Sequence, residues 1–502
     1  MKNLFSALPA LLLPMSTFGK EAPKPNFLFI LVDDLGKEWI SCYGAKGINT
    51  PRIDRLAREG MRFERAYSMP QSTPSRIALM TGKYPYHNGW INHFDVPRWG
   101  HGASYDVNLN GSFGCVLRDA GYRTCAAGKW QVNDFRLEPK AMVTAGFDEY
   151  CMWTGGEGGN ELASNKRYWD PYIHTKEGSR TYEGKFGPDV FSDFIVDFMR
   201  KHKDEPMCIY YPMVLTHIPF TNTPHEPDAT TIYEKHCAMV RYTDYITGKL
   251  ADEIDRLGIA DNTYIILTSD NGTAGIVVGQ RNDSFIRGGK TYLTENGINA
   301  PFIVRGPGIT KGSVSQALVD FADLYPTLLE LAGVSCQNGS SIDGVSFAGA
   351  LRGGPGARNW ATSLGGQPAM IGPDRMVKSY YNFRDRAIIG EKYKVYVDTL
   401  RRIEHIFEMA IDPWEENDLI SDPVIVKEVG RIFAPVIDAM PLRDENPHYR
   451  KLSGSLYDEP VEKINAASKR GNSRNTNMLP RVKENDFMRF RNSKQTQAGG
   501  DD

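Results

Sequence analysis

The sequence predicts an α/β fold: a large, mostly parallel sheet sandwiched by helices, with a smaller C-terminal antiparallel sheet packed with one helix. Three observations predict it. Apolar runs such as residues 26–32 are uninterrupted, as in strands buried on both faces. These runs alternate with amphipathic segments such as residues 189–202, as in βαβ units. Beyond about residue 350, the strand-like runs become short and follow one another closely.

The elements of the large sheet are expected along residues 26–331. Strands are predicted at residues 26–32, 124–127, 207–215, 264–268 and 301–304. Helices are predicted at residues 53–58, 115–120, 189–202, 234–257 and 321–331. Residues 77–80 also read as a short helical run. The order of the two kinds of segment favours a sheet with helices on both faces.

The second sheet follows a Gly-Gly-Pro-Gly linker at residues 353–356. Its predicted strands and single helix are residues 387–389, 393–397, 406–409 and 423–439. Residues 461–494 carry nine Lys or Arg against three Asp or Glu, which fits either a solvated tail or an arm wrapping the main domain. The predicted domains are a signal peptide (1–19), a catalytic α/β domain (20–355), a C-terminal α+β subdomain (356–445) and a C-terminal extension (446–502).

The composition excludes several classes of function. Hydrophobic residues make up 41% and the net charge is −2, which favours a globular protein and argues against nucleic acid as a partner. No apolar run reaches the ~20 residues of a membrane span. The seven cysteines include no C-x-x-C pair, so neither a disulfide scaffold nor a zinc site is expected.

The first nineteen residues have the pattern of an export signal. Lys2 precedes an apolar run over residues 4–14, and small residues follow at 16–19. A buried N-terminal helix is the alternative, but two prolines interrupt it. We therefore expect a soluble periplasmic or secreted protein.

Oxygen-bearing side chains follow two of the predicted buried strands. Asp33 and Asp34 follow the first strand, and Asp270 and Asn271 follow the strand at 264–268. Ligands of parallel sheets gather at the carboxyl ends of the strands, so these side chains are expected to meet. Carboxylate and amide oxygens suit Ca²⁺, or Mg²⁺ as the second choice, whereas an Asp-rich turn is the structural alternative.

Cationic and imidazole groups are expected at the same edge. Lys129, His217 and Lys290 follow other predicted strand ends, and Arg76 lies in a polar stretch with Ser72. Each alone has an ordinary structural explanation. Together with a metal ion they predict a pocket for a tetrahedral oxyanion, as in phosphoryl or sulfuryl transfer.

Residues 72–82 (STPSRIALMTG) carry the most specific motif. They resemble the hallmark C/S-x-P-S-R-x-x-x-L/M-T-G of the type I, formylglycine-dependent sulfatases, within the alkaline-phosphatase-like superfamily. The resemblance extends in consistent order over about residues 24–425. It includes the segments 50–57, 121–130, 146–150, 269–272 and 326–329.

This resemblance implies a role for Ser72. In serine-type members of the family, a maturase oxidises this serine to formylglycine, and the hydrated aldehyde is the nucleophile. One hydroxyl attacks sulfur and expels the alcohol, and the second allows sulfate to leave by elimination. An unmodified serine would remain a stable sulfate ester.

The resemblance also assigns the other site residues. Asp33, Asp34, Asp270, Asn271 and the oxidised Ser72 correspond to the Ca²⁺ ligands. Arg76 and Lys129 correspond to residues that hold the formylglycine hydrate. Lys129 and Lys290 match lysines that contact sulfate, and His217 matches the histidine that protonates the leaving oxygen.

One position departs from the family pattern. Gln131 stands where a histidine usually assists regeneration of the nucleophile. Glutamine can hydrogen-bond but cannot act as a base, so another group takes the proton or turnover is slower. His87 and His93 are candidate replacements, although each could instead contact substrate.

The substrate prediction depends on residues 87–101, which are dense in aromatic, imidazole and cationic groups. Trp90 and Trp99 could stack on sugar rings, and Arg98 could meet a carboxylate or a second sulfate. A well-packed loop is the alternative. The hypothesis is a sulfated polysaccharide or oligosaccharide, with His87, His93, Arg98 and Gln131 as substrate-binding candidates.

Two other functions compete with a sulfatase. A phosphatase or phosphodiesterase of the same superfamily would need further Asp and His metal ligands. A non-catalytic binder of sulfated glycans would keep Ser72 unmodified. An assay of phosphate against sulfate esters separates the first, and the mass of the Ser72 peptide separates the second.

Overall fold

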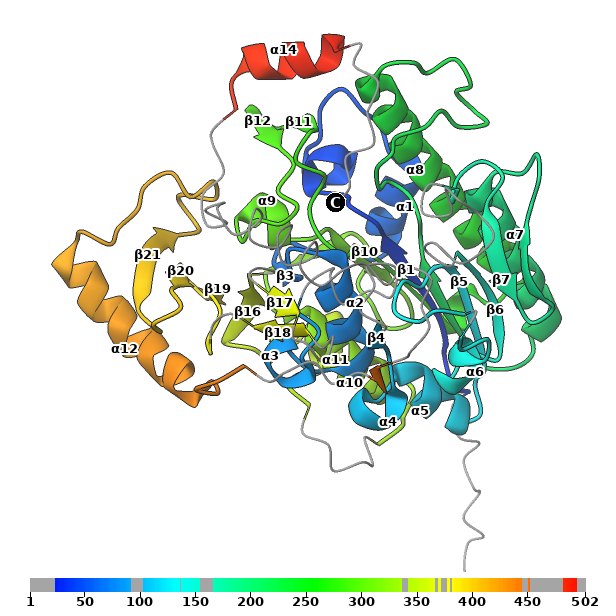
Figure 1. The fold of residues 1–502 in the computed structure, drawn as a ribbon, viewed down its shortest axis with the longest axis horizontal. Coiled ribbons are helices and arrows are strands. Elements are labelled where there is room, and N and C mark those ends of the chain that lie inside the picture. The colour runs from blue at the N-terminus through cyan, green and yellow to red at the C-terminus, as the bar shows by residue number, and fades with distance from the viewer. Residues whose placement is uncertain are drawn as a thin grey trace, which may run out of the picture.

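The computed structural model has the predicted α/β architecture, with one large sheet and a separate small one (Figure 1). It describes residues 23–91, 103–135, 137–153, 166–335, 342–365, 369–371, 377–379, 382–444, 450–451 and 482–493. The expected signal peptide therefore lies outside the described residues. In the described part of the chain, no helix combines the length and apolar character needed to cross a membrane.

Within the described residues, the large sheet has ten strands, of which the central five are parallel. In spatial order these are β10 (Thr263–Ser269), β1 (Asn26–Val32), β9 (Met207–Pro212), β5 (Arg123–Lys129) and β6 (Glu149–Trp153). The outer strands join them mainly by antiparallel pairing. They are β13 (Phe302–Arg305), β2 (Met61–Phe63) and β14 (Ser313–Ser315) on one side, and β7 (Tyr172–Thr175) and β8 (Gly178–Thr181) on the other.

Both faces of this sheet are buried, which explains the uninterrupted apolar strands. In β1, Phe27 and Phe29 belong to the core on one face, and Leu28 and Ile30 to the core on the other. Helices cover both faces (Figure 1). The first face packs against α2 (Ser72–Thr81), α5 (Phe113–Asp119) and α10 (Leu324–Leu331). The second packs against α1 (Pro51–Glu59), α7 (Gly187–His202) and α8 (Ile232–Arg256).

The small sheet forms the yellow and orange lobe of Figure 1 with helix α12 (Pro423–Ala439). Its antiparallel strands are β16 (Trp360–Leu364), β19 (Arg386–Gly390), β20 (Tyr393–Val397) and β21 (Ile403–Glu408). Phe433 and Ile437 of α12 pack on this sheet, which confirms the predicted subdomain architecture. The opposite face shares a core with Leu293 and Ile298 of the main body.

Described parts of the C-terminal extension contact the main body. Strand β22 (Arg450–Lys451) pairs with β4 (Ala103–Ser104), and helix α14 (Glu484–Asn492) places Phe487 and Phe490 against Tyr233 of α8. For these parts the structure favours an arm over a solvated tail. The predicted domain boundaries themselves stay predictions.

Several predicted element boundaries were wrong. The strand predicted at 207–215 ends at Pro212; residues 213–216 continue beside the end of β1 through backbone hydrogen bonds to Leu31 and Asp33, and they lead to His217. The helical run at 77–80 is the second half of α2, which begins at Ser72. The strand at 301–304 lies at 302–305 and runs antiparallel, and strand β16 was not predicted.

Candidate active site

Two acidic strand ends meet at the carboxyl edge of the large sheet. Asp33 and Asp34 follow β1, and Asp270 and Asn271 follow the neighbouring parallel strand β10. The Asp270 N–H donates to the carbonyl of Val32 at 3.0 Å, and Asn271 Nδ2 donates to Asp34 Oδ1 at 2.7 Å. Asp34 has a left-handed backbone (φ 63°), a conformation that non-glycine residues adopt at a cost and that recurs at functional sites.

Ser72 is the first residue of α2. Proline is tolerated at position 74 because the first turn of a helix has no partner for its N–H, and Gly82 ends the helix with φ 70°. Ser72 Oγ lies 3.3 Å from Asp33 Oδ1 and 3.4 Å from Asn271 Oδ1. The nucleophile candidate therefore lies at the positive end of a helix, which favours negative charge.

The motif around Ser72 orients both the helix and the first cation. Ser75 Oγ bonds to the Gln71 carbonyl at 2.9 Å and to Met69, which fixes the turn before the helix. Arg76 lies one turn after Ser72, on the same helix face. Its guanidinium donates to Asp270 Oδ2 at 2.7 and 3.0 Å and lies 3.3 Å from Asp33.

The remaining cations approach from two other elements. Lys129 Nζ, at the end of β5, lies 2.9 and 3.0 Å from the Asp33 oxygens and 3.5 Å from Ser72 Oγ. Lys290 Nζ lies 3.0 Å from Asp34 Oδ2 and 2.9 Å from His217 Nε2. The structure thus brings together all the predicted catalytic and metal-ligand residues.

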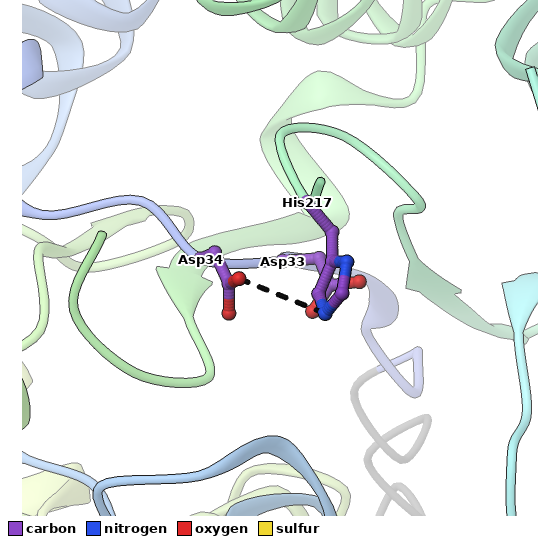
Figure 2. A group of neighbouring side chains, drawn as sticks. All are labelled: Asp33, Asp34 and His217. Atoms are coloured by element: carbon purple, nitrogen blue, oxygen red, sulfur yellow. Dashed lines mark ion pairs between the residues drawn. The ribbon is translucent and has the colours of Figure 1, made fainter. Parts of the chain in front are cut away.

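His217 reaches from the loop after β9 toward Asp33 and Asp34, as Figure 2 shows. Its Nε2 lies 3.7 Å from Asp34 Oδ2. Its Nδ1 lies 2.6 Å from the carbonyl oxygen of Ile218, so Nδ1 carries a proton and donates it. That leaves Nε2 directed toward the reaction centre.

The buried charges of the site perturb each other strongly. Burial raises the pKa of Asp33, but Lys129, His217, Arg76 and Lys290 outweigh burial and hold this pKa well below its ordinary value of 3.8. Burial lowers the pKa of Lys129 to about 8, although Asp33 partly offsets the effect. Such mutual perturbation at a strand-end cluster is typical of a functional site.

The donor set fits a hard divalent cation. Asp33, Asp34 and His217 offer ligand atoms within 4.8 Å of one another, and all three are buried. Asn271 Oδ1 and Ser72 Oγ lie beside the same carboxylates. A set of carboxylate, amide and hydroxyl oxygens matches Ca²⁺ or Mg²⁺ better than a soft metal.

The predicted substrate-binding residues are only partly accounted for. His93 and Arg98 lie outside the described residues. His87 Nδ1 contacts both oxygens of Asp343, at 2.8 and 2.9 Å. Gln131 has a left-handed backbone (φ 76°), and its buried Oε1 has no hydrogen-bond partner among the described residues.

The position of Trp90 contradicts the expectation that it stacks on a sugar ring. Its side chain is fully buried in the core, so it cannot stack on a sugar, and the packed-loop alternative holds at this position. No local pattern indicated Asp343 either, because the residue that orients His87 comes 256 positions later. Trp99 lies outside the described residues.

A hydroxyl at a helix N-terminus that faces a cationic, metal-competent pocket suits the hydrolysis of an ester whose anion is tetrahedral. That is the class of enzyme that the fold and the site define. The Sulfatase family model matches residues 25–334, and the chain belongs to this family. The protein is therefore a sulfuric ester hydrolase.

Individual relatives agree with this assignment. The chain is 25% identical over 491 residues to an N-acetylgalactosamine-6-O-sulfatase of Bacteroides thetaiotaomicron, covering 83% of this chain and 94% of the relative. It is 31% identical over 367 residues to the N-acetylgalactosamine-6-sulfatase of Canis lupus familiaris, covering 66% and 67%. The crystal structure of Ps i-CgsB shares the fold, with a TM-score of 0.71, 23% identity and coverage of 89% and 98%.

Proposed function

We propose that this sulfatase removes sulfate esters from a sulfated polysaccharide or oligosaccharide, using a formylglycine formed from Ser72 and a bound Ca²⁺. The observation that supports it most is the position of Ser72 Oγ. It lies at a helix N-terminus, 3.3 Å from a metal-competent carboxylate and 3.5 Å from the Lys129 ammonium. A hydrated aldehyde at this position would supply a nucleophile that an unmodified serine lacks.

Each of the site residues then has a defined role. Asp33, Asp34, Asp270 and Asn271 would hold the ion, which supplies positive charge for the sulfate oxygens. Arg76 and Lys129 orient the nucleophile, and Lys129 and Lys290 bind the sulfate. His217, when it carries a proton on both ring nitrogens, gives the Nε2 proton to the leaving alcohol oxygen and keeps the Nδ1 proton hydrogen-bonded to the Ile218 carbonyl.

The carbohydrate substrate is supported by the names of the relatives. They include an N-acetylglucosamine-6-O-sulfatase of Bacteroides thetaiotaomicron, 24% identical over 82% of this chain, and an ulvan-active sulfatase of Formosa agariphila, 26% identical over 80%. The name of each of these two relatives indicates a sulfated carbohydrate as its substrate. We propose the same substrate class for this chain, and export to the periplasm or medium where such polymers are met.

The decisive experiment is performed on protein matured in its native host or co-produced with a formylglycine-generating maturase. The Ser72 peptide should lack two hydrogens relative to serine, and sulfated oligosaccharides should release sulfate. Phosphate esters should react far more slowly. Unmodified serine in an active preparation would refute the mechanism, and binding without turnover would indicate a non-catalytic glycan binder.

Metal content tests the second half of the proposal. Chelation should abolish turnover, and Ca²⁺ should restore it better than Mg²⁺. An Asp34→Asn variant should bind less Ca²⁺ in calorimetry because one anionic ligand is lost. Asp283→Asn is the matched control, because Asp283 is exposed and pairs with Lys46 on the surface. Full activity in metal-free protein would contradict the proposal.

A further inference from the structure

Three consecutive side chains hold the loop that carries His217. Arg167 Nη2 donates to the carbonyl of Ile218 at 2.6 Å. Tyr168 Oη lies 2.7 Å from the carbonyl of Val214 and 2.5 Å from that of His217. Trp169 Nε1 donates to the carbonyl of Asn222 at 3.2 Å. We call Arg167, Tyr168 and Trp169 the His217 clamp.

Arg167 and the imidazole of His217 are linked through one shared acceptor atom. The Ile218 carbonyl oxygen that accepts from Arg167 is the same atom that accepts from His217 Nδ1. A carbonyl oxygen has two lone pairs and can accept both donors. Arg167 therefore fixes the acceptor that fixes the orientation and Nδ1 proton of His217.

An ion pair does not explain the position of Arg167. Its side chain is only 3% exposed, and in the described part of the chain no carboxylate lies within salt-bridge distance of it. The guanidinium instead lies over the ring of Trp153, 4.5 Å from the centroid. Trp153 is the strand partner of Lys129. Burying a cation that has no counter-ion among the described residues is costly, which indicates a task beyond packing.

The chemistry of arginine suits this task. Its planar guanidinium can stack on an indole and donate to a carbonyl at the same time, whereas a lysine ammonium offers no plane. The position of the guanidinium over the Trp153 ring anchors it to the end of β6, beside the end of β5 that carries Lys129. The His217 loop is thereby tied to the same sheet edge as the other site residues.

We propose that Arg167 and Tyr168 are positioning residues for His217, holding its loop so that Nε2 points at the leaving oxygen of the ester. The inference rests on the proposed function, in which the S–O bond breaks, its electron pair stays on the alcohol oxygen, and the Nε2 proton neutralises that oxygen. A sugar alcohol leaves poorly without this proton. A nitrophenol leaves well without it.

The test compares two leaving groups on the matured enzyme. In Arg167→Met, kcat for a sulfated oligosaccharide should fall about 30- to 100-fold, while kcat for para-nitrophenyl sulfate should fall less than about 3-fold. Arg167→Lys should recover part of the loss, since it restores a donor. Tyr168→Phe, which removes one hydroxyl, should show the same selectivity with a loss of about 10-fold.

The matched control is Arg180→Met. Arg180 also lies over an aromatic ring, that of Tyr182 at 4.6 Å, but on the exposed edge strand β8, so neither rate should change. A crystal structure of Arg167→Met should show the His217 ring turned from its present orientation. Equal losses on both substrates, or no loss in either, would overturn the inference. A wild-type enzyme that hydrolyses no sulfate ester would instead refute the proposed function.

Discussion

Two clusters of buried charge can be compared in this molecule. At the sheet edge, Arg76, Lys129 and Lys290 contact the strand-end carboxylates. Between the main body and the small sheet, Lys394 of β20 lies 3.1 Å from Glu295 and 2.7 Å from Glu415. Both clusters are almost inaccessible to water.

The two clusters differ in how completely the hydrogen bonds and ion pairs of their polar groups are satisfied within the cluster. In the interface cluster, Tyr396 Oη also contacts Glu415 at 2.6 Å, and the Glu295 N–H donates to Glu415. Its groups link β20 to helix α9 (Glu295–Ile298) and surround no nucleophile. At the sheet edge, the cations surround a hydroxyl whose contacts are 3.3 Å or longer. The two buried charge clusters of this molecule therefore differ in one respect: only the sheet-edge cluster, among the described residues, surrounds a weakly bonded hydroxyl that is a candidate nucleophile.

The largest expected effect is at Ser72. Ser72→Ala should lower kcat by ~10⁴-fold or more, because the nucleophile and its modification are both removed. The melting temperature should change little, since the Ser72 hydroxyl makes only long contacts. Sulfate release and calorimetry measure the two quantities.

The control serine should behave in the opposite way. Ser112 Oγ caps helix α5 by accepting from the Gly114 N–H at 3.1 Å, so Ser112→Ala should cost about 1 kcal/mol of stability and leave kcat unchanged. If both serine variants lost activity equally, the contrast between a reactive and a structural hydroxyl would be wrong.

The next effect concerns the interface cluster. Lys394→Met leaves Glu295 and Glu415 buried without their cation, which should cost about 3–5 kcal/mol of unfolding free energy in urea. Activity per folded molecule should be retained. Lys392→Met is the control, because Lys392 is half exposed, lies 3.8 Å from Glu408 and should contribute little to stability. A loss of activity without a loss of stability would assign this cluster to the site.

Much of the sheet-edge cluster could be predicted from the sequence, because its residues directly follow strands that the sequence reveals. A strand buried on both faces has a continuous apolar pattern, and the residues directly after it lie at the ligand-binding edge. Asp33, Asp270 and Lys129 could therefore be placed together from their positions along the chain. Arg76 follows Ser72 by one helical turn of α2, but a helix was predicted only from residue 77, so their common face was not predicted.

The second cluster and the His217 clamp could not be predicted in this way. Glu295 and Lys394 are 99 residues apart, and Arg167 is 51 residues from Ile218. Nothing near either residue indicates its partner, because the contacts arise from the packing of separate elements. The two alternatives for Trp90, sugar stacking and a packed loop, could not be separated from the sequence for a related reason: an aromatic residue in a polar segment is equally compatible with a binding surface and with a core. The structure supports the packed loop.

A smaller effect is expected at Asp320, which joins the main body to β16 by accepting from the Thr362 N–H. Burial raises the pKa of Asp320 to about 7; Arg358 opposes the rise and Asp323 adds to it. Between an unfolded pKa near 3.8 and this value, the folded state holds a proton that the unfolded chain has lost. Stability should therefore fall as the pH rises through this window, by roughly 2 kcal/mol between pH 5 and pH 8.

Asp320→Asn should remove most of this dependence of the unfolding free energy on pH, as measured by urea unfolding at several pH values. The exposed Asp261→Asn variant should keep the wild-type slope. If the unfolding free energy of Asp320→Asn still fell with pH as in the wild type, a group other than Asp320 would be the one that titrates. The pKa assigned to Asp320 would then not be the cause of the pH dependence.

The smallest effect is expected at Gln131, where the site departs from its family. Its left-handed backbone is one that histidine tolerates better than most residues, so Gln131→His should be accommodated. A base at this position should raise kcat by up to about 10-fold if regeneration of the nucleophile limits turnover, while the first turnover stays unchanged. Stopped-flow and steady-state rates separate the two, and Gln131→Ala should not accelerate either. An unchanged kcat in Gln131→His would mean that a different group already takes the proton. His87, whose Nδ1 lies 2.8 Å from Asp343, is then the first residue to replace, since this contact fixes the orientation of its ring.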